Sequence, residues 1–135
     1  MQKKRYSIDG NDFSNLSGFY DVVSRTIIPN SEWGRNLDAF NDILRGGFGT
    51  PEEGFTIIWK NAKVSKERLG YEETENEMKR ALHECHPTNR EIVQERIRKA
   101  QMREGETIYD WLIEIIEDHG PNGDQKEDQV ELILD

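Results

Sequence analysis

Hydrophobic residues recur at helical spacing in two segments near the start of this chain. The first extends from Asn15 to Ile28 and is followed by Pro29, which cannot continue a helix. The second begins near Asn36, a residue suited to cap a helix N-terminus, and stops at Gly46-Gly47. We therefore expect two amphipathic helices here. Their apolar positions include Leu16, Phe19, Val22 and Val23 in the first, and Leu37, Phe40, Ile43 and Leu44 in the second.

A third segment, Thr107 to His119, carries the strongest apolar stripe of the chain. Thr107 and Asp110 resemble a capping box at its start, and Gly120-Pro121 follows its end. We expect a well-formed helix between these signals. Its apolar side consists of Ile108, Trp111, Leu112, Ile115 and Ile116.

Two carboxylates lie one turn apart on the second predicted helix. Asp38 and Asp42 share one helical face, where like charges destabilise an isolated helix by about 0.2–0.5 kcal/mol. One interpretation is an ordinary solvated face, in which Asp38 interacts with the helix dipole and Asp42 pairs with Arg45. The other interpretation is a binding role for both carboxylates.

The segment from residue 33 to residue 47 resembles a known family. Its pattern G-x-N-L-D-A-[aromatic or apolar]-x-D-x-L-x-G is similar to the central motif of the barstar family, the intracellular inhibitors of secreted bacterial ribonucleases. The resemblance implies that this helix and the loop before it enter the ribonuclease active site. Asp42 would meet the enzyme's phosphate-binding arginines and catalytic histidine, with Asp38 assisting. The residues that would shape the approach loop are Trp33, Gly34 and Asn36.

Four residues near the motif depart from the family pattern. Glu32 stands where an aromatic residue packs on the ribonuclease, and we count it among the candidate contacts. Arg35 replaces an acidic residue, Asn41 replaces an aromatic one, and Arg45 adds a positive charge. These changes fit either a different ribonuclease partner or a family member that no longer inhibits one. A further acidic contact could come from Glu114 or Glu117 of the last helix.

The resemblance extends to both ends of the chain and implies three strands. The segments similar to them are Tyr6–Gly10, Phe55–Trp59 and Val130–Leu134. Strands separated by helices favour a parallel sheet, because parallel neighbours need a crossover connection. We expect an α/β fold in which residues 1–135 form a single barstar-like domain, with a small three-stranded parallel sheet packed by helices. The expected order is β-α-α-β-(α insert)-α-β.

The resemblance weakens over residues 63–104, where the smaller members of the family have a short connecting segment, and this is the largest departure from the family pattern. The pattern in this insert predicts helices over Ser65–Leu69, Glu72–Leu82 and Asn89–Met102, with His86-Pro87-Thr88 between the last two. The stretch Thr88–Glu91 predicts a capping box. The apolar content is low, so we expect a folded helical insert in thin contact with the core.

Charge separates the insert from the rest of the chain. The chain has a net charge of −9, and ten basic against eight acidic residues between Lys63 and Arg103 leave about −11 on the remaining framework. An acidic framework disfavours nucleic acid, whose binding needs Lys and Arg, and favours a basic protein partner. Acidity is also common in proteins simply because it favours solubility.

No other motif predicts a cofactor or metal site. The cluster His83-Glu84-Cys85-His86 lacks the spacing of a zinc site, and Cys85 is the single cysteine, so no disulfide can form within the chain. Gly46–Gly49 lacks the Lys-Ser/Thr of a phosphate loop. Magnesium or acid–base chemistry at Glu32, Asp38 and Asp42 has no supporting residues, so we do not expect an enzyme.

The predicted function is ribonuclease inhibition by an acidic helix and its preceding loop. The predicted partner is a basic ribonuclease or a related protein, with no direct contact to nucleic acid or membrane. No apolar run of 18 residues and no apolar N-terminal segment occur, so we expect a cytoplasmic protein. The alternative is an interaction module of the same fold that binds an unknown partner through the insert.

Overall fold

Three parallel strands form the sheet of this protein. The computed structural model describes residues 3–135. The strands are β1 (Lys4–Asp9), β2 (Phe55–Lys60) and β3 (Val130–Leu134), with β2 in the middle. Ile57 is aligned with Tyr6 on one side and with Leu132 on the other. The parallel sheet predicted from the alternation of strands and helices is therefore confirmed.

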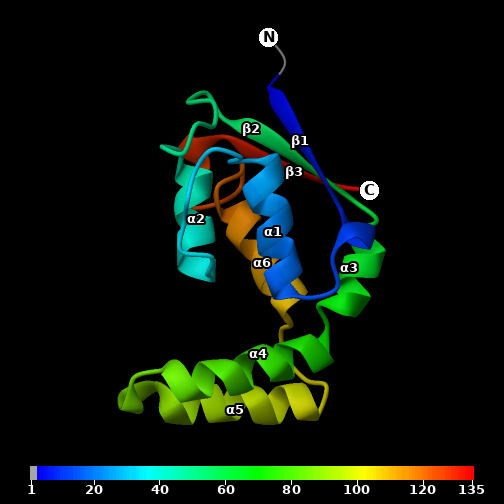
Figure 1. The fold of residues 1–135 in the computed structure, drawn as a ribbon, viewed down its shortest axis with the longest axis vertical. Helices are drawn as coiled ribbons and strands as arrows, with labels where there is room; N and C mark the ends of the chain where they lie inside the picture. The colour runs from blue at the N-terminus through cyan, green and yellow to red at the C-terminus, as the bar shows by residue number, and fades with distance from the viewer. Residues whose placement is uncertain (1–2) are drawn as a thin grey trace.

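Three helices cover one face of this sheet (Figure 1). They are α1 (Leu16–Thr26), α2 (Leu37–Arg45) and α6 (Ile108–Asp118). Trp59 of β2 is fully buried beneath them and stacks on Phe19 of α1, with 5.4 Å between the ring centroids. Phe19 also meets Phe40 of α2 edge to face at 5.3 Å. The predicted apolar stripes thus converge on the central strand.

The caps predicted from the sequence fix where these helices begin. The Asn15 side chain accepts a hydrogen bond from the Gly18 N–H, and Asn36 accepts one from Ala39. Thr107 and Asp110 form the expected capping box of α6. Gly46 ends α2 with a φ of 103°, a conformation that favours glycine.

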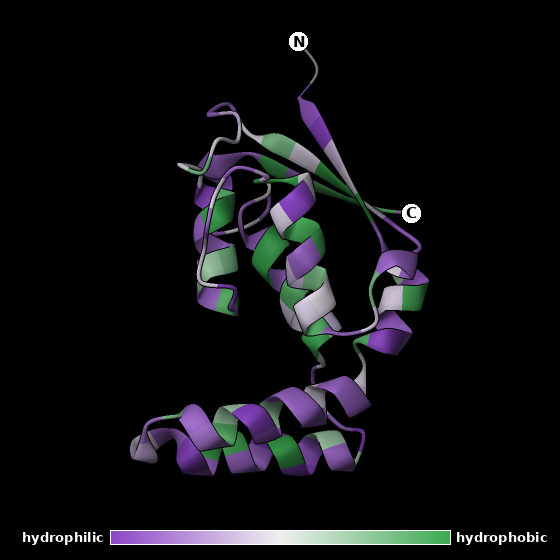
Figure 2. Cartoon of the chain, in the orientation of Figure 1, coloured by the Kyte–Doolittle hydropathy of each residue, from purple (hydrophilic) through white to green (hydrophobic). Residues whose placement is uncertain are grey.

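The insert forms a short helix and a helical hairpin. Helix α3 (Ala62–Arg68) continues from β2, and α4 (Tyr71–Glu84) and α5 (Arg90–Gln101) lie side by side at the end of the molecule remote from the sheet (Figure 1). The hairpin is mostly hydrophilic (Figure 2). Among the described residues of α3, α4, α5 and the turns between them, Ala62 and Leu69 belong to the main hydrophobic core. The thin contact expected from the composition is therefore confirmed.

The capping box predicted at Thr88 is wrong. Residues Pro87–Asn89 form a 3-10 turn, η2, and the Asn89 side chain makes no cap at the start of α5. A capping residue has an extended backbone, whereas Asn89 has φ −98° and ψ −4°. The His86 ring instead accepts a hydrogen bond from the Thr88 N–H, at 3.2 Å.

The base of the hairpin is tied to the framework by hydrogen bonds between backbone and side chains. The Glu73 carboxylate accepts the Leu16 N–H at 2.8 Å, at the start of α1. The Thr74 hydroxyl accepts the Ile108 N–H at 2.9 Å, at the start of α6. The insert is therefore held in place at its base although it adds little to the core. Within residues 3–135, no helix is both long and apolar enough to cross a membrane.

Candidate functional site

The loop before α2 is fastened to α1 by two side chains. The Trp33 indole N–H donates to the Ser24 hydroxyl at 2.7 Å, and its ring meets Tyr20 edge to face at 5.2 Å. Arg35 pairs with Asp21 of α1 at 2.7 Å. Arg35 also has a φ of 52°, a conformation that is costly for a residue other than glycine and is held here by these contacts. The loop therefore has a fixed shape as it enters α2.

The two motif aspartates lie on the exposed side of α2. Asp38 is exposed in the first turn, and the side chain of Asp42 is 60% exposed one turn later. The Asp42 carboxylate lies 3.7 Å from the Arg45 guanidinium, which is the pairing expected of an ordinary solvated face. Exposed pairs of this kind contribute about 0–1 kcal/mol.

A buried histidine holds α2 through Asn41, which lies on a neighbouring face of the helix. His119 is fully buried, and its Nε2 lies 2.6 Å from Oδ1 of Asn41. The Nδ1–H donates to the Asp128 carboxylate, also at 2.6 Å. Asp128 belongs to a short 3-10 turn, η3 (Lys126–Asp128). This histidine thus joins α2, the end of α6 and the turn before β3.

Sequence reasoning missed this network. It treated Asn41 only as a departure from the family pattern and gave no role to Asp128. Asp128 is partly buried and lies within hydrogen-bond distance of His119. One signal was present in the sequence: Asn41 lies four residues after Leu37 and three before Leu44, within the apolar stripe.

The C-terminal end of α2 is tied to the same turn region. The Arg45 guanidinium donates to the Gln125 side chain at 2.7 Å, and Gln125 donates onward to the Asp118 carboxylate at 2.8 Å. This hydrogen bond from Gln125, followed by one from the Asp124 N–H, holds the pKa of Asp118 below its usual value. Arg45 therefore bridges the site helix and the loop that follows α6.

The six candidate contact residues all lie on this loop and helix, and five of them are exposed. Trp33 is half-buried because its ring packs on α1. The exposed candidates are Glu32, Gly34, Asn36, Asp38 and Asp42. No group of three or more residues suited to hold a metal ion occurs in the part of the chain that the structure describes.

The two acidic residues considered on the last helix are exposed on α6. Glu114 lies beside Glu106, and the hydrogen bond between their carboxyl groups raises the pKa of Glu114. Glu117 lies one turn further along the helix. Both therefore belong to an acidic surface of α6.

The chain is similar to the proteins of a known family. The family described as Barstar (barnase inhibitor) matches residues 4–97. The chain belongs to the barstar family. A protein of Bacillus subtilis (strain 168) named "Putative ribonuclease inhibitor YrdF" is 34% identical over 67 residues, which are 50% of this chain and 70% of that protein. Both similarities support a barstar-like inhibitor with a ribonuclease as its kind of partner, and the barstar family consists of inhibitors rather than enzymes.

Proposed function

We propose that this barstar-family protein inhibits a basic ribonuclease by inserting α2 and residues 32–36 into the enzyme's active site. The observation that carries the proposal is the exposure of Asp38 and Asp42, one turn apart, on a helix that is fixed on its inner side. A ribonuclease active site binds phosphates through basic side chains. Two carboxylates at helical spacing can occupy the place of such phosphates.

Asp42 is the centre of the proposed contact. Arginine binds a carboxylate through two parallel hydrogen bonds, which are short and directional. The existing pair between Asp42 and Arg45 is exposed and weak, so an arginine of the ribonuclease can replace Arg45 at little cost. Arg45 keeps its hydrogen bond to Gln125 when Asp42 changes partner.

The fixed shape of the loop and helix favours tight binding. Ordering a flexible side chain or loop on binding costs about 0.5–1.5 kcal/mol for each immobilised side chain. Trp33 and Arg35 already hold the loop against α1, and Asn41 holds α2 against His119. The internal pairing of Arg35 with Asp21 also offsets the positive charge that distinguishes this loop from the family pattern.

The test is calorimetric titration of a barnase-type ribonuclease with this protein, together with an assay of RNA cleavage. We expect one-to-one binding that inhibits cleavage, and a loss of about 2–5 kcal/mol in Asp42→Ala, because the substitution leaves arginines of the enzyme unpaired. That loss corresponds to a rise in Kd of about 30-fold to several thousand-fold.

A matched control is Asp12→Ala, which removes one exposed carboxylate from the turn after β1. We expect its Kd to stay within about threefold of the unaltered protein, since exposed charges outside an interface act only at long range. Equal affinity of Asp42→Ala and Asp12→Ala would contradict the proposed binding mode.

The same titration separates this proposal from binding through the insert. Deletion of the whole insert is unsuitable, because Leu69 is fully buried and Thr74 pairs with α6. A better variant replaces residues 82–94, the outer part of the hairpin, with a short Gly-Ser turn. Binding that survives Asp42→Ala but disappears in this variant would favour the interaction module.

A further inference from the structure

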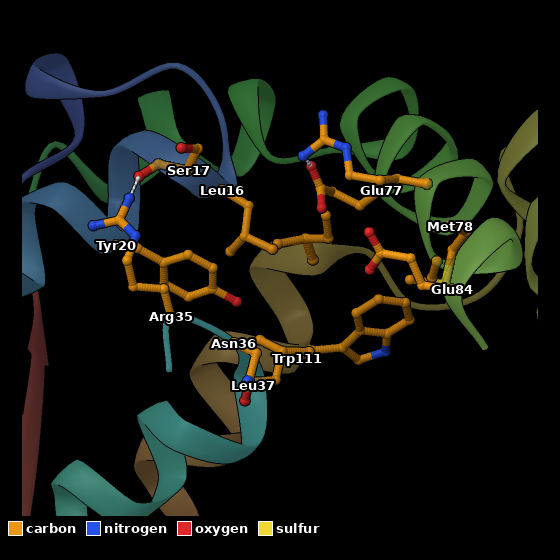
Figure 3. A pocket seen from close by; sticks show the side chains of 13 residues that line it. Leu16, Ser17, Tyr20, Arg35, Asn36, Leu37, Glu77, Met78, Glu84 and Trp111 are labelled. Atoms are coloured by element: carbon orange, nitrogen blue, oxygen red, sulfur yellow. Dashed lines mark hydrogen bonds and ion pairs between the residues drawn. The ribbon is translucent and has the colours of Figure 1, made fainter. Parts of the chain in front are cut away.

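A cleft of about 380 Å³ separates α4 from α1 and the start of α2 (Figure 3). We propose that this cleft receives a lysine or arginine side chain of the ribonuclease, so that the insert acts as a second arm of the inhibitory surface. This inference rests on the proposed function and extends it to the insert. The side chains that carry the argument are Tyr20, Leu37, Glu77, Met78, Glu84 and Trp111.

The cleft combines an apolar lining with carboxylates at its α4 wall. Figure 3 shows the Tyr20 hydroxyl, the Glu84 carboxylate and the Trp111 indole around the same space. A long basic side chain suits this lining, because its aliphatic stem packs on apolar groups while its charged end meets carboxylates and aromatic faces. Trp111 already accepts one cation: Arg96 of α5 lies 5.5 Å from its ring centroid and lines a different hollow.

The carboxylates of α4 at the cleft are not all neutralised by nearby arginines. Glu77 pairs with Arg80 at 2.9 Å, and Glu73 and Glu84 lie on the same helix. Burial, followed by the nearby charges of Glu73 and Glu84, raises the pKa of Glu77 above its usual value despite Arg80. The other arginine of the cleft, Arg35, pairs with Asp21. An added cation therefore meets the carboxylate of Glu84, which has no ion-pair partner among the described residues, although the insert as a whole is slightly basic.

The cleft is continuous with the proposed inhibitory surface. Arg35, Asn36 and Leu37 line it, and the next residue along the chain is Asp38. Its walls keep a fixed spacing, because Glu73 binds the start of α1 and Thr74 binds the start of α6. A ribonuclease seated on Asp38 and Asp42 therefore brings its basic surface to the mouth of this cleft.

The test compares two charge-reversal variants of the insert. The association and dissociation rates with a barnase-type ribonuclease are measured, and their ratio gives the Kd of each variant. Glu84→Lys places a positive charge in the cleft, whereas Glu91→Lys makes the same change in net charge on an exposed position of α5. We expect Glu84→Lys to raise Kd by about tenfold or more, and Glu91→Lys by less than about threefold. Glu84→Gln should give a smaller rise than Glu84→Lys. Circular dichroism should show that all three variants are folded, since residue 84 is exposed at the helix end.

Two outcomes would overturn the inference, and they are distinguishable. If the unaltered protein binds and Asp42→Ala does not, but Glu84→Lys and Glu91→Lys bind equally well, the cleft takes no part and the proposed function stands. If the unaltered protein does not bind or inhibit the ribonuclease, the proposed function and this inference both fail.

Discussion

Asn41 and Asp42 are neighbours in the sequence and point about 100° apart around α2, so that one is hydrogen-bonded inside the protein and the other faces solvent. The Asn41 amide is hydrogen-bonded to the buried His119, whereas the Asp42 carboxylate is exposed. A helix that presents charged groups to a partner gains from such an internal anchor, because the exposed face then has one orientation. The hydrogen bond between Asn41 and the buried His119 therefore supports the proposed binding surface, although His119 itself touches no partner.

Replacement of His119 by alanine should lower the free energy of unfolding by about 2–4 kcal/mol. The change leaves Asn41 and Asp128 without their shared partner and opens a cavity in a fully buried position. Urea unfolding monitored by tryptophan fluorescence measures the loss. The control His83→Ala alters an exposed histidine of α4 and should change stability by less than about 0.5 kcal/mol. Similar losses in the two variants would show that the buried network contributes nothing specific.

Part of the candidate site could be recognised from the sequence, and part could not. The two aspartates were recognised because they recur at helical spacing within a family motif, and the Asn36 cap because its residue type precedes an apolar stripe. The link between Asn41 and His119 spans 78 positions, and no local pattern connects residues that far apart. The cleft was missed for the same reason, since its walls come from separate helices.

Helices α1 and α2 begin in the same way, with an asparagine whose side chain accepts a backbone N–H three residues later. The caps differ in what lies beyond them. Asn15 starts α1, which packs on the sheet and contributes Leu16, Ser17 and Tyr20 to the cleft, whereas Asn36 starts the helix that carries the two motif aspartates. This pairing allows the contribution of a cap to stability to be separated from its contribution to binding.

Asn36→Ala and Asn15→Ala should each lower the free energy of unfolding by about 1 kcal/mol, the usual loss for an N-cap. Asn36→Ala should weaken ribonuclease binding by about fivefold for 1 kcal/mol, because the first turn of α2 then frays beside Asp38, and Asn15→Ala should weaken it less, because the turn that it caps carries no motif aspartate. Chemical unfolding and calorimetric titration of both variants measure the two quantities. An equal effect on affinity would argue against a role for the first turn of α2.

The helices of the insert were predicted within one to three residues of their bounds, but their arrangement was not. Their apolar positions are sparse, so the sequence did not indicate which surfaces meet. In the structure Val93 and Ala100 of α5 are buried, yet they lie outside the main core. The hairpin is therefore stabilised mainly by contacts between its own two helices and by the hydrogen bonds at its base.

The distribution of charge over the whole molecule should appear in the kinetics of binding. The framework carries about −11 and the insert about +2, so a basic enzyme is attracted chiefly to the framework. We expect the association rate to fall about tenfold or more between 50 and 500 mM salt, while the dissociation rate changes little. Stopped-flow fluorescence measures both rates. An association rate that is independent of salt would contradict electrostatic steering.

The order of strands in the sheet has a consequence for how the chain folds. β2 pairs with β3 across an interval of about seventy residues, and closing so long a loop carries an entropic cost before the pairing can form. The α4–α5 hairpin lies within this interval and relies on contacts between segments close in sequence, which form early. Once folded, the hairpin shortens the flexible path from β2 to β3. The same insert that forms one wall of the cleft can therefore also speed the completion of the sheet.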